Sequence, residues 1–254
     1  MAPRPRFDRP VAHRGLHDRA AGIIENSASA FAAAIERGFA IECDLQLTSD
    51  GEPVVFHDDD LPRLTGRSGF VRDLPVAEMT ALPLLDSTAG DRPQRFGDFL
   101  DQVGGRTLLQ VELKRQKGRA ATETLASKAA AALAAYKGPV TVESFDPHLI
   151  ALVRRYGFAG PVGIITYGYD KPEWEDGVTP AQRFLLRHLL HAPYSRFTFI
   201  SCYQEALDLP AVRFWRALGV PVTAWTVRSP DQARAAAGRA DQIVFEGFDP
   251  DRLQ

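Results

Sequence analysis

Cysteine and long apolar runs are both scarce in this sequence of 254 residues. The only two cysteines, Cys43 and Cys202, lie far apart and form no CxxC pair, which argues against a disulfide scaffold or a zinc site. No run of eighteen apolar residues occurs, and no apolar segment follows the arginines near the start of the chain. We therefore expect no membrane span and no signal peptide, with a cytoplasmic protein as the default.

An excess of charge of either sign is also missing. The 30 lysines and arginines nearly balance the 32 aspartates and glutamates, so the net charge is −2. This balance gives no reason to expect a nucleic-acid partner and is compatible with a small-molecule ligand. The length fits one α/β barrel, and we expect a single domain over residues 1–254.

Short apolar runs typical of strands alternate along the chain with patterns typical of helices. Such alternation predicts a parallel sheet, and eight strands predict a closed (β/α)8 TIM barrel. An open, doubly wound sheet is the second candidate, although no dinucleotide-binding fingerprint follows the first strand. The eight expected strands are 11–13, 41–47, 107–113, 140–142, 162–165, 197–201, 221–227 and 242–245.

Residues 58–95 interrupt this alternation. The segment contains four prolines and several glycines, and an extended run at 53–57 precedes it. We expect an insertion after the second strand, with little regular structure, that covers one side of the barrel mouth. The tail 249–254 is too short for a complete eighth helix.

Three carboxylates lie on two neighbouring expected strands. Glu42 and Asp44 are two residues apart, so they share one strand face, and Glu112 has the matching place on the next strand. Carboxylate oxygens without thiolates suit a hard cation, Mg²⁺ or Ca²⁺, rather than zinc. The alternative is an ion-pair network in which Arg14 and Lys114 neutralise the three acids.

Two histidines, His13 and His57, each end an expected strand close to these carboxylates. A pair of imidazoles near neutral pKa can divide the acid and base roles of a hydrolysis. Asp58 either orients His57 or is an exposed loop acid. The other four histidines have no such setting, so we expect structural or solvent-facing roles for His17, His148, His188 and His191.

The two cations Arg14 and Lys114 are suited to bind phosphate oxygens, one through a planar fork and one as a compact charge. Trp225, near the end of a late strand, either forms an apolar wall at the barrel mouth or fills the core. Together with the histidines and carboxylates, these groups are the inventory of a metal-assisted phosphodiesterase.

These residues form an ordered set of short motifs that resembles the glycerophosphodiester phosphodiesterase family over nearly the whole chain. The motifs are Ala12-His13-Arg14-Gly15, Glu25-Asn26-Ser27, Glu42-Cys43-Asp44, His57-Asp58, Glu112-Leu113-Lys114, Ser144-Phe145-Asp146 and Trp225-Thr226-Val227.

The resemblance implies a TIM barrel with an insertion after the second strand. It also implies a metal bound by three carboxylates, an acid/base pair of histidines, and phosphate contacts from two cations. The implied ligands are Glu42, Asp44 and Glu112, the implied pair is His13 and His57, and the implied phosphate contacts are Arg14 and Lys114. Glu25 belongs to a Glu-Asn-Thr element of the family, in which this chain has Ser27 instead of threonine.

Two departures from the family pattern lie near the expected barrel mouth. Arg228 follows Thr-Val where the family usually has asparagine, and Phe245-Glu246 replaces the usual Thr-Asp. Both leave the alcohol moiety of the substrate open. We expect hydrolysis of a glycerophosphodiester to sn-glycerol 3-phosphate and an alcohol. The alternatives are a lysophospholipase D-like phosphodiesterase and a non-catalytic barrel that binds a phosphorylated ligand.

Overall fold

Eight parallel strands close into a barrel in the computed structural model, which describes residues 4–171 and 177–253. The barrel closes because β1 pairs with both β10 and β2, which excludes an open sheet. The predicted TIM barrel is confirmed. Its strands are β1 (Val11–Ala12), β2 (Ala40–Leu47), β5 (Leu109–Leu113), β6 (Val140–Ser144), β7 (Val162–Thr166), β8 (Phe199–Tyr203), β9 (Val222–Val227) and β10 (Gln242–Phe245).

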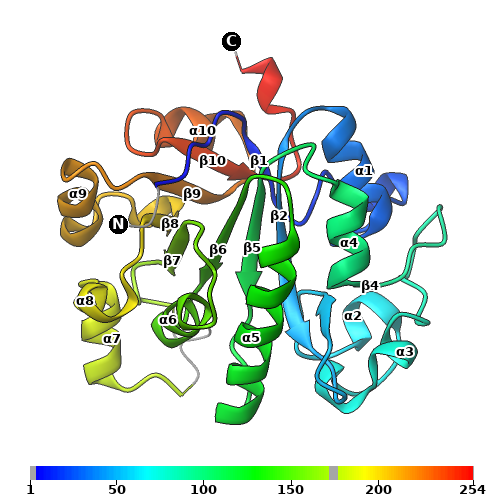
Figure 1. Ribbon diagram of the computed structural model, residues 1–254. Coiled ribbons are helices and arrows are strands. Elements are labelled where there is room, and N and C mark those ends of the chain that lie inside the picture. Colours follow the sequence, from blue (N-terminus) through cyan, green and yellow to red (C-terminus); the bar gives the residue numbers. More distant parts are fainter. Residues whose placement is uncertain (1–3, 172–176, 254) are drawn as a thin grey trace.

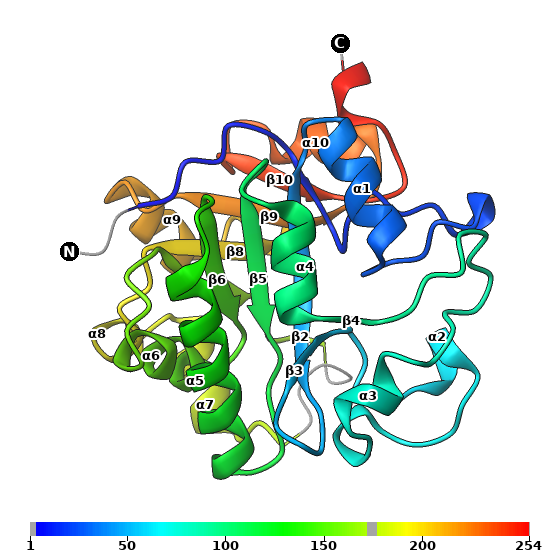
Figure 2. The same ribbon diagram turned by 45° about the vertical axis from the view of Figure 1, so that its right-hand side comes forward.

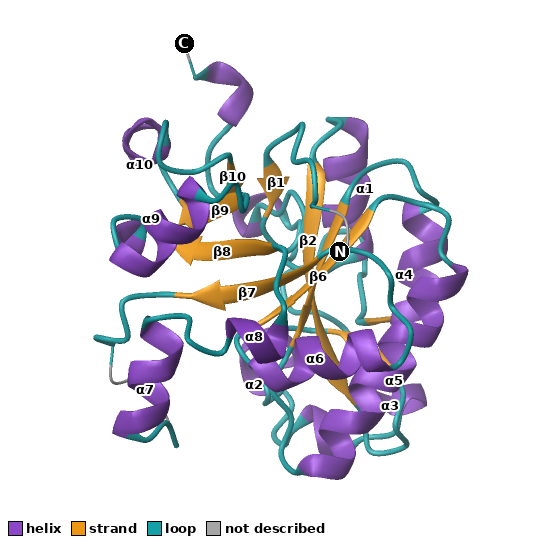
Figure 3. Ribbon diagram, turned by 60° about the vertical axis from the view of Figure 1, so that its left-hand side comes forward, coloured by secondary structure: helices purple, strands orange, loops and turns teal. Residues whose placement is uncertain are grey.

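Helices connect the strands and surround the barrel (Figure 3). Four helices of seven or more residues have proline in the first turn, where no intrahelical N–H is needed: α6 (Pro147–Arg155), α7 (Pro180–Arg187), α9 (Pro210–Ala217) and α10 (Pro230–Ala236). The others are α1 (Ala28–Glu36), α4 (Phe96–Val103), α5 (Arg119–Ala135) and α8 (Ala192–Ser195), with 3₁₀ turns η1 (Arg19–Ala21), η4 (Gln204–Ala206) and η5 (Pro250–Arg252).

Within the described residues, β10 is followed only by η5, which agrees with the expectation that the tail is too short for an eighth helix. None of the described helices combines the length and apolar character needed to cross a bilayer.

The main apolar core lies between the barrel wall and the helices. Alternate β2 side chains, including Ile41, Cys43 and Leu45, pack there against helical residues such as Phe31 and Leu125. The opposite strand faces point into the barrel and carry buried polar groups, because side chains alternate along a strand. These inner residues include Glu42, Asp44, Gln110, Glu112, Glu143, Ser201 and Thr223.

The insertion begins and ends at a small antiparallel addition to the barrel, formed by β3 (Pro53–Val55) and β4 (Gln94–Arg95). Between them lie α2 (Pro62–Thr65), η2 (Val71–Asp73) and α3 (Val76–Met79). Figures 1 and 2 show these elements beside the end of the barrel toward which the arrow of β2 points.

The expectation of little regular structure holds for element length, but it missed that the insertion has an apolar core of its own. Nine buried side chains form this core, which we call the insertion core: Leu61, Leu64, Val71, Leu74, Met79 and Leu84 of the insertion, together with Ile24, Val54 and Phe56 from outside it.

Candidate active site

Three buried carboxylates lie together at the centre of the barrel mouth. Glu42 and Asp44 come from the inner face of β2, and Glu112 comes from β5, where it pairs in register with Asp44. One oxygen from each lies within 4.8 Å of the others. The fold therefore brings together the three carboxylates that we predicted as metal ligands.

Arg14 lies two residues after β1 and contacts two of these acids. Its φ of 55° is left-handed, a conformation that non-glycine residues seldom adopt, and its backbone N–H donates to Glu42 Oε2 at 2.9 Å. Its guanidinium lies 2.8 Å from Glu25 Oε1 and 3.4 Å from Asp44 Oδ2. Glu25 thus holds the arginine that faces the central carboxylate.

Asn26 and Lys114 complete the surroundings of Asp44. The Asn26 amide donates to Asp44 Oδ2 at 2.8 Å, so this residue fixes a carboxylate and is not the helix cap, a role that Ser27 takes. The Lys114 ammonium lies 2.9 Å from Asp44 Oδ1 and donates to Glu112 Oε1 at 3.0 Å. Both predicted phosphate-binding cations therefore lie at the carboxylate cluster.

Burial and mutual repulsion set the charge of this cluster. Burial, with Asp44 and Glu112 nearby, raises the pKa of Glu42 well above its usual range, and burial raises the pKa of Glu112 to about 7. Burial also opposes ionisation of Asp44, but Lys114, His57 and Arg14 together hold the pKa of this carboxyl well below its usual range. Arg14 also acts on Glu42, but burial and the two neighbouring carboxylates outweigh it.

A divalent cation fits this donor set. Glu42 Oε1 is buried and has no hydrogen-bond partner among the described residues, so it is free to coordinate. Hard oxygen donors from carboxylates are the ligands that Mg²⁺ and Ca²⁺ prefer. Added positive charge would favour the ionised forms of Glu42 and Glu112, whose pKa values burial raises.

His57 follows β3 on the insertion side of the mouth. Its Nδ1 lies 2.7 Å from Asp58 Oδ1, and Arg63 of α2 donates to Asp58 Oδ2 at 2.6 Å. The same guanidinium donates twice to Glu25, at 2.7 Å for each bond. Arg63 therefore links Asp58, the partner of His57, to Glu25, the partner of Arg14.

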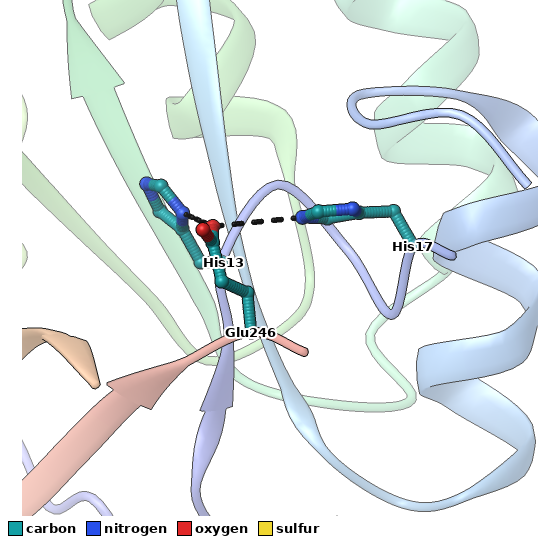
Figure 4. A group of neighbouring side chains, drawn as sticks. All are labelled: His13, His17 and Glu246. Carbon is teal, nitrogen blue, oxygen red and sulfur yellow. Dashed lines mark hydrogen bonds and ion pairs between the residues drawn. The ribbon is translucent and has the colours of Figure 1, made fainter. Parts of the chain in front are cut away.

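His13 follows β1 and has a corresponding set of partners. Its Nδ1 lies 2.5 Å from Glu246 Oε2, and Arg228 Nε donates to Glu246 Oε1 at 2.7 Å. The other nitrogen, Nε2, is 3.9 Å from Glu42 Oε2. Figure 4 shows Glu246 between His13 and His17.

The expectation for His17 needs correction, because this residue borders the site. Its Nε2 lies 3.6 Å from Glu246 Oε2, which is too long for a hydrogen bond. No local pattern indicates this contact, because 229 positions separate the two residues.

Both site histidines are disposed to be neutral. Burial, reinforced by Arg14, lowers the pKa of His13 to about 4. Burial and the nearby Lys114 also lower the pKa of His57. A neutral imidazole has one protonated nitrogen and one that can accept a proton, which is the form a general base needs.

Trp225 lies on the inner face of β9 and is half-buried. Its ring centroid is 5.6 Å from that of Phe145 and 5.3 Å from that of Tyr203, and its Nε1 donates to the Ser201 carbonyl at 3.0 Å. The indole is therefore part of an aromatic group at the ends of the later strands, and it also packs against a buried cluster of Phe7, Val11, Ala40, Phe199 and Val244.

Sequence reasoning missed the roles of Arg63 and Glu143. Arg63 lies in the irregular insertion and had no signal beyond its charge. Glu143 directly follows the strand predicted to end at residue 142, and it pairs in register with Glu112 inside the barrel. Burial raises its pKa to about 8, and Gln110 donates to it at 2.9 Å. Extending that strand by one alternation would have placed Glu143 on the inner face.

The fold and the geometry together define a class: a TIM barrel with buried carboxylates, two histidines and two cations at the carboxyl ends of its strands. Comparison with known proteins identifies the family. The model of the glycerophosphoryl diester phosphodiesterase family matches residues 13–249. The chain belongs to this family and is an enzyme, a phosphoric diester hydrolase.

Relatives and solved structures agree with this assignment. The chain is 27% identical to a glycerophosphodiester phosphodiesterase of Caldanaerobacter subterraneus subsp. tengcongensis, over 96% of this chain and 95% of the relative. A phosphodiesterase of Oleispira antarctica, solved in complex with the product sn-glycerol-3-phosphate, superposes with a TM-score of 0.79 at 20% identity, over 98% and 96% of the two chains. A putative glycerophosphoryl diester phosphodiesterase from Silicibacter pomeroyi gives 0.75 at 24% identity, over 96% and 91%.

Proposed function

We propose that the enzyme hydrolyses glycerophosphodiesters to sn-glycerol 3-phosphate and an alcohol, with a divalent cation and two histidines. One observation carries this proposal: His13 and His57 approach the carboxylate cluster from β1 and from the insertion side, each with its Nδ1 on a carboxylate. The product bound to the Oleispira antarctica relative is consistent with this substrate class.

The chain's own residues divide the work as follows. Glu42, Asp44 and Glu112 hold the cation, which when bound supplies positive charge against the charge that develops on the phosphate oxygens. Arg14 and Lys114 orient the phosphate through charge-assisted hydrogen bonds. One histidine takes a proton from the attacking hydroxyl, and the other gives a proton to the oxygen of the departing alcohol.

The insertion favours a substrate with a short alcohol over one with a long acyl chain. Most of its large apolar side chains are already packed in the insertion core, and the exposed fraction of each is at most 9%. Only Phe70 and Leu85 of this segment are large, apolar and exposed, at 39% and 40%. Two separate side chains provide little surface for a lipid tail.

One assay separates the proposal from its rivals. Release of sn-glycerol 3-phosphate from glycerophosphocholine should exceed release of choline from lysophosphatidylcholine by at least about tenfold. The reverse preference would identify a lysophospholipase D-like enzyme. Binding of glycerol phosphate without turnover of either substrate, in protein loaded with Mg²⁺ or Ca²⁺, would identify a non-catalytic barrel.

A further inference from the structure

Glu246, the first residue after β10, has more charged neighbours than a surface loop acid needs. The exposed fraction of its side chain is 18%, and its two oxygens face different groups. Oε2 meets His13 Nδ1 at 2.5 Å, whereas Oε1 accepts from Arg228 Nε at 2.7 Å. His17 stands on the other side of the carboxylate (Figure 4).

An ionised carboxylate can only accept a hydrogen bond, so it selects the tautomer of a neutral imidazole beside it. When Glu246 accepts from Nδ1, that nitrogen carries the proton of His13 and Nε2 is left with a free lone pair. Nε2 is also the nitrogen that faces the carboxylate cluster, 3.9 Å from Glu42 Oε2. The hydrogen bond thus aims the basic nitrogen at the reaction centre.

We propose that Glu246 is a positioning residue that fixes the Nδ1-protonated tautomer of His13, and that Arg228 holds the carboxylate in place for this task. This proposal deepens the proposed function and rests on it for the catalytic consequence. The tautomer itself is a property of the folded chain and can be tested without turnover.

The second histidine supports this interpretation because it shows the same order of groups. His57 Nδ1 meets Asp58, and Asp58 accepts from Arg63 Nε at 2.6 Å. At both sites an imidazole Nδ1, a carboxylate and an arginine Nε follow one another. Two arrangements of the same chemistry, built from unrelated segments, indicate a shared requirement for an oriented imidazole.

The same three side chains, His13, His17 and Glu246, could instead hold a borderline metal such as Zn²⁺, since their ligand atoms lie within 4.8 Å of one another. The charges disfavour this alternative. Arg228 already neutralises Glu246 through Oε1, and the guanidinium would repel a second cation.

The first experiment reads the tautomer directly, from ¹⁵N chemical shifts of the histidine rings at neutral pH. Wild-type protein should show protonated Nδ1 and unprotonated Nε2 for His13, and His57 serves as the internal reference. Glu246→Gln should change the His13 pattern, because an amide can also donate, and should leave His57 unchanged. An Nε2-protonated His13 in the wild type, or an unchanged His13 in Glu246→Gln, would overturn the proposal.

The second experiment measures turnover of glycerophosphocholine. Glu246→Gln should lower kcat about 10- to 100-fold with KM and Mn²⁺ affinity little changed, the scale expected when the partner that orients a functional histidine is lost. Glu246→Asp should recover part of the kcat. Glu123→Gln is the matched control: it removes a glutamate from the Arg119–Glu123 surface pair on α5, which is not among the site residues, and should change nothing.

The remaining outcomes are distinguishable. A higher KM or a loss of folding in Glu246→Gln, with kcat unchanged, would show that Glu246 has a structural role and would overturn the proposal. Binding of one extra Zn²⁺ per chain that His17→Gln removes would identify a metal site and also overturn it. Wild-type protein with the expected tautomer but no turnover would refute the proposed function and leave the positioning of His13 intact.

Discussion

The two histidine sites of the barrel mouth are similar in chemistry and different in construction. On the insertion side, His57 and its carboxylate Asp58 are adjacent in the sequence, and Arg63 lies five residues after Asp58. On the barrel side, 233 positions separate His13 from Glu246, and Arg228 comes from the end of another strand. One arrangement is local, whereas the other exists only after the barrel has closed.

This difference shows how each histidine depends on the rest of the fold. The His57 arrangement depends on the folding of the insertion, whose core packs α2 against β3. The His13 arrangement requires β10 to pair with β1, because that pairing sets Glu246 beside His13. Asp44 lies between them and contacts Arg14 and Lys114, so both sites should act on one centre.

The largest expected effect comes from removing that shared centre. Asp44→Ala should reduce hydrolysis of glycerophosphocholine to background, because the cation, Arg14 and Lys114 lose their common carboxylate. An excess of chelator on the wild type should do the same, because it removes the cation. Adding Mg²⁺, Ca²⁺ or Mn²⁺ should restore the chelated wild type only. Full turnover in chelator, with no metal found by elemental analysis, would refute the shared centre.

The next effect separates the two histidines. His13→Ala and His57→Ala should each lower kcat on the order of a hundredfold or more, because each removes one proton transfer. With a glycerophosphodiester of p-nitrophenol, whose leaving group needs no proton, only the variant lacking the general acid should recover. Circular dichroism checks that both variants fold. If neither recovers, or if both do, the division of acid and base roles is wrong.

Replacing Arg63 or Arg228 should lower kcat by a smaller factor, and the two factors should differ. Arg63 binds both Asp58 and Glu25, whereas the hydrogen bond of the Arg228 side chain goes to Glu246. Losing charge-assisted hydrogen bonds at Arg63→Gln should therefore cost about tenfold in kcat, and Arg228→Gln only a few-fold. Equal kcat losses for the two variants would show that the link from Arg63 through Glu25 to Arg14 has no role.

A third partly buried histidine, which has no carboxylate partner among the described residues, gives the smallest effect and a contrast in stability. His191 Nδ1 lies 2.9 Å from Ser195 Oγ, and burial lowers the pKa of His191 to about 4. Because the unfolded value is about 6.5, the unfolded chain binds more protons between these values. The contribution of His191 to the free energy of unfolding is therefore complete above pH 6.5 and is lost as the pH falls toward 4.

The size of this contribution is at most about 3.4 kcal/mol, because the pKa moves from 6.5 to about 4. Urea unfolding at pH 7 and pH 4.5 measures it, and His191→Gln should reduce the loss on acidification. The exposed His188→Gln is the control and should behave as the wild type. An equal loss in both variants would show that His191 does not contribute to the acid sensitivity.

Much of the barrel could be predicted because its signals are local. All eight expected barrel strands occur, since each apolar run is short and bounded by glycine, proline or charge. The inner and outer faces of β2 followed from strict alternation, which sent Cys43 to the helices and Glu42 to the interior. The insertion core was missed because its apolar residues follow neither period.

The site residues also differ in whether a local pattern could reveal them. Glu42, Asp44 and Glu112 were found because they occupy strand positions whose direction the period fixes. Asp58 was recognised because it adjoins His57. Glu246 was noticed only as a departure from a family pattern, because its partner depends on barrel closure and on the direction of one side chain.

The antiparallel pairing of β3 with β4 has a consequence for how such enzymes diversify. Val55 and Gln94 are partners in this ladder, so the chain leaves the barrel and returns to it at nearly the same place. A segment with adjoining ends and a core of its own can be exchanged for another of different length without reshaping the barrel. A graft from a relative would need to retain His57, Asp58 and an arginine at the place of Arg63, so that the choice of alcohol can change while the cleavage chemistry stays the same.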